Sequence, residues 1–458
     1  MAEEATVGRD RVAPTDVHSG QSDGEDNLKQ SIGFLGLLAL SIGINIGGGL
    51  FVLVNLAAAE TGPSLPLAML LSAIPALLAI VPYRVLSSAY PTTSASYRYM
   101  KLWSPRIAYM ASTALLLSII LGGQPLFALM TGDYLARLSW INLSPRVLAI
   151  AVLAAFYVIN LLGVRLAVVV QSVLLFVLLG SLSAFVFAGW GSVEVARFSD
   201  PLPGGAMGLV TATVMLYALL AGGLFVVEVG GEVVEPQRMF AKVLPLGMVI
   251  VLALYIGMTI VAVGAVPWQT LDGTNLVDVA EAFMGSTGIT VFILGGAVVA
   301  GITTINGVFT LVSRGMLVVA EEGLFPAAIG RVNERFGTPH WGLTVCFVGS
   351  LAVLLIGPDK TFLGVLMNLG LVVAIAVVCV SAARLPRFHP KLFAAGQGRL
   401  SAATLRRVSR TVVGLNMFVV LALASEAPLP ALLLLVAAGL AGLLHRRIAR
   451  EPADEAIM

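Results

Sequence analysis

Runs of apolar residues long enough to cross a lipid bilayer recur along almost the whole chain. A membrane-spanning helix needs about 20 mainly apolar residues, and the sequence contains twelve such runs. Charged residues make up only 11% of the 458 residues, against roughly 25% in soluble domains. We therefore predict an all-α integral membrane protein with about twelve transmembrane helices. The predicted spans are residues 31–57, 64–83, 106–135, 146–163, 166–189, 206–235, 241–266, 286–319, 341–357, 361–383, 410–426 and 428–446.

The basic residues predict the side of the membrane on which each loop lies, because Lys and Arg are enriched in cytoplasmic loops. With the N-terminus in the cytoplasm, only four of the 27 Lys and Arg residues fall outside: Arg137, Arg146, Arg197 and Lys360. We expect a multi-pass protein of the cytoplasmic (plasma) membrane with both termini in the cytoplasm. The basic loop 386–409 is interpreted as a cytoplasmic anchor that touches anionic lipid head groups, not as a nucleic-acid-binding site.

The segments outside the core helices complete the predicted organisation. Residues 1–30 are polar and acidic, which predicts a disordered cytoplasmic tail, and residues 448–458 form a second cytoplasmic tail. The two helices of residues 410–447 are peripheral and are expected either to dimerise or to pack on the core. The four histidines lack paired carboxylates and metal-ligand spacing, so we expect neither an enzyme nor a bound cofactor. They are His18, His340, His389 and His445.

Glycines interrupt two of the predicted helices. The first helix contains SIGINIGGGLF (residues 41–51), and the sixth is broken by Gly222 and Gly223. Inside a bilayer, irregular backbone survives where it lines a protein cavity; the alternative is close helix packing, because Gly43 and Gly47 have GxxxG spacing. Helices one and six correspond if residues 31–205 and 206–385 are inverted five-helix repeats. In transporters of that kind, broken helices direct their ends at a substrate near the membrane midplane.

Three segments of the chain carry recognisable motifs: GINIGGGLFVLVNLAAAETGP, LLAGGLFVVEVGGEVVEPQRMFAKVLP and TINGVFTLVSRGMLVVAEEGLFP. In this order they resemble the first, sixth and eighth helices of the amino acid, polyamine and organocation (APC) permeases. The matching positions of the eighth helix are Asn306, Ser313, Arg314, Glu322, Gly323 and Pro326. The resemblance covers roughly residues 31–385 and implies an inverted five-plus-five repeat with discontinuous helices 1 and 6. It implies a secondary transporter and is much less specific about the substrate.

The chemistry of helix ends predicts a substrate site at the two breaks. A carboxylate is best bound by free amides at the start of a half-helix and an ammonium by carbonyls at the end of one. We expect amides near Gly47, Gly48 and Gly49 to bind the carboxylate, and carbonyls near Ile42 and Gly43 to bind the ammonium with those of residues 218–221. Gln124 fits either the cavity or an interhelical hydrogen bond equally well. The predicted substrate-binding residues are Ile42, Gly43, Asn45, Gly47, Gly48, Gly49, Gln124, Tyr217, Ala218, Ala221, Gly222 and Phe225.

Two groups of residues are candidates for ion coupling. Thr303 and Thr304 resemble the hydroxyl pair with which sodium-coupled relatives bind a sodium ion beside carbonyls of helix one, since hard cations prefer oxygen ligands. The alternative is that each threonine bonds the backbone of its own helix. Glu228 would carry a coupling proton or bind a cationic substrate if it faces the cavity, and Glu232 is predicted to be an intracellular gate residue. Proton-coupled relatives often have a Lys in helix five where this chain has Leu178.

The sequence thus predicts a transporter that moves an amino acid or related small amine by alternating access, coupled to sodium or protons. A substrate/product exchanger of the same fold and a substrate sensor that does not transport are the alternatives. Accumulation of labelled substrate inside proteoliposomes would separate transport from binding alone.

Overall fold

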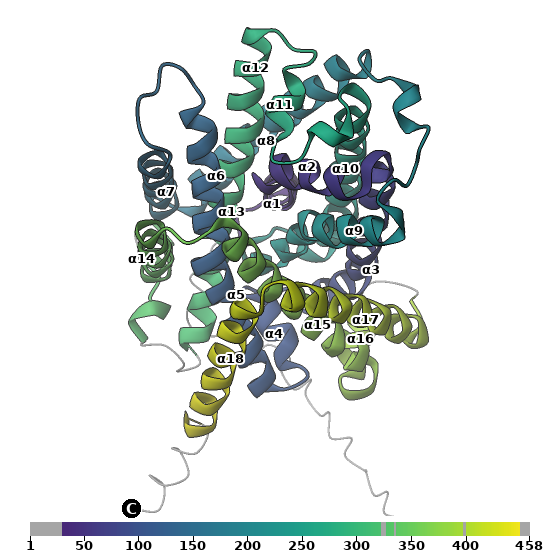
Figure 1. Ribbon diagram of the computed structural model, residues 1–458. Helices are drawn as coiled ribbons and strands as arrows, with labels where there is room; N and C mark the ends of the chain where they lie inside the picture. Colours follow the sequence, from purple (N-terminus) through teal and green to yellow (C-terminus); the bar gives the residue numbers. More distant parts are fainter. Residues whose placement is uncertain (1–29, 322–326, 334–335, 397–399, 449–458) are drawn as a thin grey trace, which may run out of the picture.

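The computed structural model describes residues 30–321, 327–333, 336–396 and 400–448, and in these residues the chain is a bundle of helices without a β-strand (Figure 1). Both predicted tails, apart from residues 30 and 448, lie outside the described residues, as do Glu322, Gly323 and Pro326. Twelve helical segments follow the predicted spans in order, which confirms the fold class. They are α1 (Phe34–Asn45) with α2 (Gly49–Thr61), α3 (Leu65–Ala89), α5 (Pro105–Ser118) with η2 (Ile119–Gly123) and α6 (Gln124–Ala136), α7 (Pro145–Leu161), α8 (Val164–Trp190), α9 (Gly205–Ala221) with η4 (Gly222–Glu228) and η5 (Gly230–Glu232), α10 (Pro236–Ala265), α12 (Ser286–Phe292) with η7 (Ile293–Val298) and α13 (Val299–Glu321), α14 (His340–Ile356), α15 (Lys360–Phe388), α17 (Ala402–Glu426) and α18 (Pro428–Ile448).

Both predicted helix breaks are present. The first transmembrane segment stops at Asn45 and resumes as α2 at Gly49. The sixth changes at Gly222 from the α-helix α9 to the 3-10 helices η4 and η5. A 3-10 helix is tighter than an α-helix and leaves its backbone groups less well bonded, so both segments offer backbone amides and carbonyls in the middle of the bundle.

Two π-helical turns mark a second pair of corresponding positions. The turn η2 reads IILGG in the third transmembrane segment, and η7 reads ILGGAV in the eighth. A Cβ atom on Gly122 would lie 2.9 Å from a backbone oxygen of α15, and one on Gly295 would lie 3.3 Å from Ser181 of α8. The third segment thus packs closely on the tenth, and the eighth on the fifth. Segments three and eight correspond in the two inverted repeats, as do five and ten, so the two contacts are equivalent.

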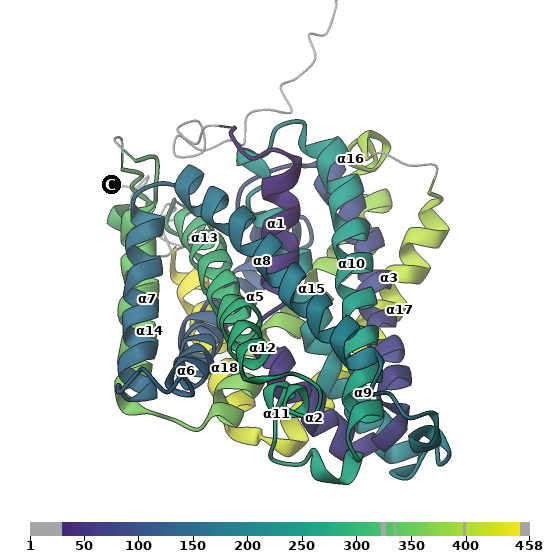
Figure 2. The same ribbon diagram turned by 90° about the horizontal axis from the view of Figure 1, so that it is seen from above.

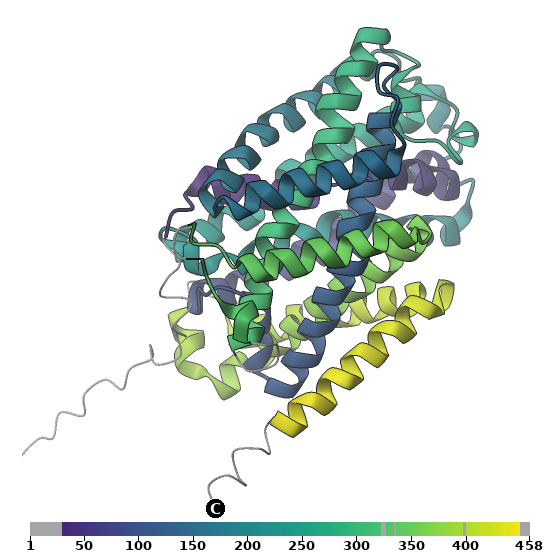
Figure 3. The same ribbon diagram turned by 90° about the vertical axis from the view of Figure 1, so that its left-hand side faces the viewer.

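The helices around the first break form the centre of the bundle. Figure 2 shows α1 with α8 and α10 beside it, and α1 also contacts α13 and η4. The outer helices expose apolar side chains to the bilayer; on α8, Phe176 is 62% and Phe187 80% exposed. The yellow helix α18 lies along the outside in Figure 3, where it packs on α5 and α15.

The helix α17 begins earlier than the sequence predicted, at Ala402 instead of residue 410. The Ser401 hydroxyl caps it by accepting a hydrogen bond from the Thr404 amide at 3.1 Å, and serine is a strong N-cap residue. The last part of the predicted basic loop is therefore helical. Residue 390 begins another short helix in that loop, α16 (Pro390–Ala395).

Candidate functional site

Side chains of α1 join the two helix breaks directly. The Asn45 Oδ1 atom accepts a 2.6 Å hydrogen bond from the backbone amide of Gly223, and the Ser41 hydroxyl donates to the Gly223 carbonyl at 3.4 Å. From α10, the Tyr255 hydroxyl donates to the Asn45 carbonyl at 3.0 Å. A Cβ atom on Gly223 would lie 2.3 Å from Asn45 Nδ2. Glycine at this position is therefore what allows η4 to approach α1.

Free backbone amides lie at the start of α2. The amides of Leu50 and Phe51 donate to the carbonyls of Gly47 and Gly48 at 3.1 and 3.2 Å. In the described part of the chain, the amides of Gly48 and Gly49 have no backbone acceptor. Together with the positive end of the helix dipole, such amides favour an anion. The side chains nearest to the three glycines of the break belong to Leu53, Phe127, Met130, Leu219 and Thr304.

Five oxygen atoms meet where α13 faces the end of α1. The Thr304 hydroxyl lies 2.9 Å from the Gly43 carbonyl, 3.4 Å from the Ile46 carbonyl and 3.0 Å from the Ala300 carbonyl. The Thr303 hydroxyl donates to the same Ala300 carbonyl at 2.9 Å. All five residues are buried. A compact set of neutral oxygens is the chemistry that a hard cation such as sodium prefers, and each threonine also makes the bond to its own helix that was the alternative interpretation.

Most predicted substrate residues lie beside the two breaks: Ile42, Gly43, Asn45, Gly47, Gly48, Gly49, Ala218, Ala221 and Gly222. The Ile42 carbonyl accepts the Ile46 amide at 2.8 Å, so one of its two lone pairs is used. Gln124 Nε2 donates to the Ile305 carbonyl at 3.3 Å, which is the predicted interhelical bond. Its Oε1 atom is buried without a hydrogen-bond partner, so Gln124 still has an acceptor to offer.

The hydroxyl contact of one predicted aromatic residue and the ring contact of another lie outside the first break. The Tyr217 hydroxyl donates to Asn416 Oδ1 of α17 at 2.9 Å. Phe225 packs edge-on against Tyr83 with 6.4 Å between the ring centres. Tyr217 thus ties the segment before the second break to a peripheral helix, and Phe225 lies on the same side as Glu228.

Amide side chains form a buried network behind the five oxygens. Asn306 of α13 accepts from Asn160 of α7 and donates to Gln171 of α8, each at 2.8 Å. Thr310 donates to Asn160 at 3.0 Å, and Gln171 donates to the Ala39 carbonyl of α1 at 3.4 Å. Every side chain of the network is buried. The network fixes the position of α13 against α1, α7 and α8, and so of the two threonines.

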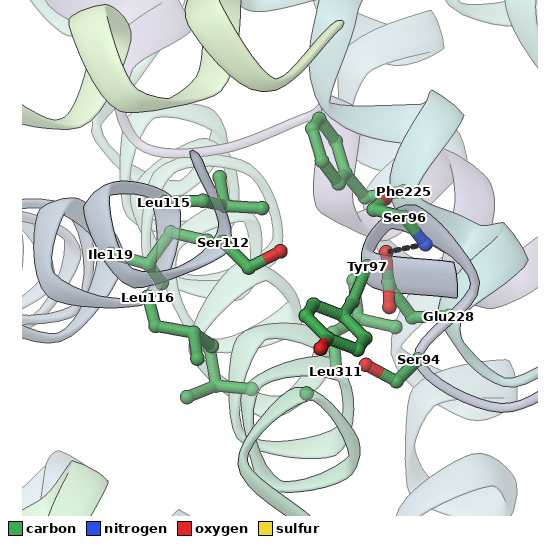
Figure 4. Close-up of a pocket in the computed structure, with 12 residues that line it drawn as sticks. Ser94, Ser96, Tyr97, Ser112, Leu115, Leu116, Ile119, Phe225, Glu228 and Leu311 are labelled. Atoms are coloured by element: carbon green, nitrogen blue, oxygen red, sulfur yellow. Dashed lines mark hydrogen bonds between the residues drawn. The ribbon is translucent and has the colours of Figure 1, made fainter. Parts of the chain in front are cut away.

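Glu228 lies at a small cavity between η4, α5, α13 and α4 (Ala95–Lys101). One carboxylate oxygen accepts the Ser96 amide at 3.0 Å, and Figure 4 shows this bond with Ser94, Tyr97 and Ser112 around the same space. The cavity has a volume of about 40 Å³, enough for a few water molecules. No cationic side chain pairs with Glu228 in the described residues. Buried acidic side chains of membrane proteins often mark ion or proton paths.

The end of the sixth segment is closed by a buried ion pair. Glu232 accepts from Arg314 of α13 at 2.8 and 3.3 Å, and both side chains are at most 2% exposed. The Glu232 carbonyl also accepts the amides of Ser31 and Ile32 at 2.9 and 3.0 Å, ahead of α1. The paired geometry and the burial make this contact rigid. At the opposite end of the bundle, exposed pairs join Asp133 to Lys360 and Arg137 to Asp278.

Sequence reasoning missed several of these residues. Gln171 had a signal, because an amide in an apolar membrane helix needs an internal partner. The carbonyls of Ile46 and Ala300 had none, since every residue carries one. Tyr255 had none either, because tyrosine is common near membrane interfaces without any role in a site.

Comparison with known proteins places this geometry in a family. The sequence profile described as "Amino acid permease" matches residues 32–439. The mitochondrial cationic amino acid transporter 3 of Arabidopsis thaliana is 27% identical over 379 residues, covering 77% of this chain and 62% of that protein. The vacuolar transporter 2 of the same plant is 27% identical, with 81% and 62% covered. This chain spans about three fifths of the length of these two relatives.

Two further proteins extend the comparison. The methylthioribose transporter of Bacillus subtilis strain 168 is 25% identical over 408 residues, covering 83% of this chain and 86% of its own. The solved structure of Mhp1, a nucleobase-cation-symport-1 family transporter in a closed conformation with bromovinylhydantoin bound, has a TM-score of 0.56. At 17% identity it covers 94% of this chain and 95% of its own, which shows a shared fold. Given the match along most of its length, the chain belongs to the amino acid permease family of the APC superfamily.

Proposed function

We propose that the protein is a secondary active transporter that moves an amino acid or a related small amine across the cytoplasmic membrane by alternating access. The observation that carries the proposal is the contact between two broken helices, through Asn45 and Gly223, beside the free amides of Gly48 and Gly49. Amides suited to a carboxylate and carbonyls suited to an ammonium lie within the same region. In the proposed cycle the substrate enters between the breaks from one side and leaves on the other.

Sodium is the coupling ion that we propose. The five oxygens around Thr304 support this choice, because they combine three carbonyls with two hydroxyls and carry no charge of their own. A sodium ion bound there would bridge α1 and α13 and so favour one arrangement of the first break. A ligand shifts such an equilibrium only by its difference in affinity for the two arrangements.

Two ends of the bundle would open in turn. The buried Glu232–Arg314 pair and the Ile32 contacts support a gate on the side where we place the cytoplasm. The exposed Lys360–Asp133 pair supports a weaker closure on the other side, because exposed ion pairs contribute little. The ring of His445, near the end of α18, lies 5.9 Å from that of Tyr109 near the start of α5. This contact supports placing the C-terminus on the side of the loop before α5, which we expect in the cytoplasm.

Glu228 supports the second candidate, in which a proton is coupled or a cationic side chain is recognised. Its carboxylate faces a cavity and has no basic partner among the described residues. Two relatives are named as cationic amino acid transporters and one as a methylthioribose transporter. A cationic amino acid is therefore the first substrate to test, and a neutral polar substrate the second.

The test is uptake by proteoliposomes of a panel of labelled amino acids, amines and methylthioribose. One set carries an inward sodium gradient, a second a proton gradient, and a third only unlabelled substrate inside. The proposal predicts accumulation with sodium that choline and potassium cannot replace. Accumulation driven by the proton gradient alone would indicate proton coupling through Glu228. Uptake only against internal substrate would make the protein an exchanger. Binding without accumulation under any condition would make it a sensor.

Matched threonine variants sharpen this test. Thr304→Val removes one oxygen and keeps the shape of the side chain, so we expect at least a tenfold rise in the sodium concentration for half-maximal uptake, about 1.4 kcal/mol. Thr213→Val is the control, because the Thr213 hydroxyl of α9 only bonds the Leu209 carbonyl of its own helix at 2.7 Å. Equal sodium dependence of uptake in the two variants would show that sodium does not bind at the proposed site.

A further inference from the structure

The first turns of α17 present a cluster of arginines on one face. Arg406, Arg407 and Arg410 are exposed and line one surface pocket together with Ala403 and Thr411. Arg410 lies four residues after Arg406 and three after Arg407, so it shares one side of the helix with both. Within the described residues none of the three arginines has a carboxylate within ion-pair distance, whereas Arg137, Arg197, Arg238, Arg314 and Lys360 all have one.

The opposite face of α17 holds the cluster in place. Leu405, Ser409 and Val412 are buried, and the helix packs on α15 and α3. The three guanidinium groups are therefore carried by a fixed helix with one side against protein and the other exposed, and Arg406 Nε donates to the Ala402 carbonyl of the same helix at 3.2 Å. A charged ligand can bind them without any rearrangement of the backbone.

The basic face continues along the helix as an exposed apolar face. Met417, Phe418 and Leu421 are 47%, 53% and 66% exposed, and nothing lies within 4 Å of where a Cβ atom of Gly414 would be. Residues 410 and 421 are eleven positions apart, so about 16 Å separates their levels at 1.5 Å per residue. Half the hydrocarbon thickness of a bilayer is about 15 Å. When the apolar face lies among acyl chains, the arginines lie at the level of the head groups.

We propose that Arg406, Arg407 and Arg410 bind the phosphate of an anionic glycerophospholipid whose acyl chains lie along Met417 and Phe418. Guanidinium groups bind phosphate through paired, charge-assisted hydrogen bonds, and basic pockets beside membrane helices bind anionic head groups. The apolar face favours a lipid over free phosphate, because free phosphate contacts only the arginines whereas a lipid also contacts Met417 and Phe418 with its acyl chains. This is a specific site and goes beyond the general attraction of basic loops to the membrane surface.

The test measures binding of phosphatidylglycerol to the full chain in detergent by native mass spectrometry. The variant carries Arg406→Gln, Arg407→Gln and Arg410→Gln. The matched control carries Arg165→Gln, Lys242→Gln and Arg446→Gln, which removes the same charge from exposed positions on α8, α10 and α18. Glutamine favours helices about as well as arginine, so both variants should keep the helices intact.

We expect the arginine variant to bind phosphatidylglycerol at least tenfold more weakly and the control to stay within twofold of the unmodified protein. Phosphatidylcholine and inorganic phosphate should bind more weakly than phosphatidylglycerol to the unmodified protein. An equal loss in both variants would show general electrostatic attraction and overturn the proposal. Competition by inorganic phosphate at the same concentration as the lipid would overturn the part played by the apolar face.

Discussion

Replacing Gly223 with alanine tests whether the contact between the two breaks holds the site together. The new Cβ atom would lie 2.3 Å from Asn45 Nδ2 and 3.0 Å from the Ser41 carbonyl oxygen. Contacts under 3.0 Å are not tolerated, so the Asn45 side chain must move. When it moves, the 2.6 Å bond from the Gly223 amide to Asn45 Oδ1 is lost.

The expected loss in the free energy of unfolding of the Gly223→Ala variant has two contributions. Overpacking a filled interior costs about 1–3 kcal/mol, and leaving a buried amide without its acceptor costs about 1–3 kcal/mol. The expected loss in the free energy of unfolding is therefore about 2–6 kcal/mol. Because η4 must also move away from α1, we expect uptake to fall more than stability alone would explain.

The assay compares thermal unfolding in detergent with initial uptake rates in proteoliposomes. Gly180→Ala is the matched control, since Gly180 is an exposed glycine within α8 and no atom lies within 4 Å of the place that a Cβ atom would take. Alanine is favoured over glycine in a helix by about 1 kcal/mol, so this control should be equal to or more stable than the unmodified protein. A Gly223→Ala variant as stable and as active as the control would refute the reasoning.

Three further changes have defined outcomes. Glu232→Ala leaves Arg314 buried without its partner, so we expect a loss of about 3–5 kcal/mol, seen as a lower unfolding temperature. Asn306→Leu leaves the Gln171 Oε1 atom of α8 without its partner and removes one of the two bonds from Asn160 Nδ2, which keeps its bond to the Phe156 carbonyl; at about 1–3 kcal/mol for the unsatisfied group, the midpoint of thermal unfolding should again shift down, and an unchanged midpoint would contradict the network. Asp359→Ala removes the N-cap of α15 and should destabilise by about 1 kcal/mol at neutral pH. The Thr361 hydroxyl and nearby amides lower the pKa of Asp359, so its contribution is present above about pH 4 and is lost as the pH falls through that lowered value; a difference from the unmodified protein that stays constant with pH would exclude this cause.

The long apolar runs and their glycine interruptions were predictable from sequence because both are local features. Length and hydropathy set each span, and Gly222 and Gly223 stand out in an apolar helix. Close packing, the alternative interpretation of the glycines in the first helix, is present at the second break. A Cβ atom on Gly222 would lie 3.0 Å from the Ile44 carbonyl oxygen, so close packing is what brings the broken backbones together.

The direction in which a side chain points, and hydrogen-bond or ion-pair partners that are distant in the sequence, were not predictable. Tyr217 was expected at the substrate site, yet its hydroxyl meets Asn416 of α17, because a helix that is apolar on all sides gives no signal for which face looks inward. The partner of Glu232 lies 82 residues away at Arg314, and sequence spacing cannot choose among distant cations. The π-helical turns at Ile119–Gly123 and Ile293–Val298 depend on packing against α15 and α8.

The most direct test of the central claim is equilibrium binding of the substrate found in the uptake panel to the Gly48→Leu variant in detergent. A Cβ atom at Gly48 would lie 3.3 Å from Met130 Cβ, so Met130 must shift by a few tenths of an ångström, and the rest of a leucine side chain would cover the free amides of the break. The account predicts a folded, membrane-inserted protein that no longer binds the substrate. Unchanged affinity would contradict it, because the amides at the start of α2 would then take no part in binding.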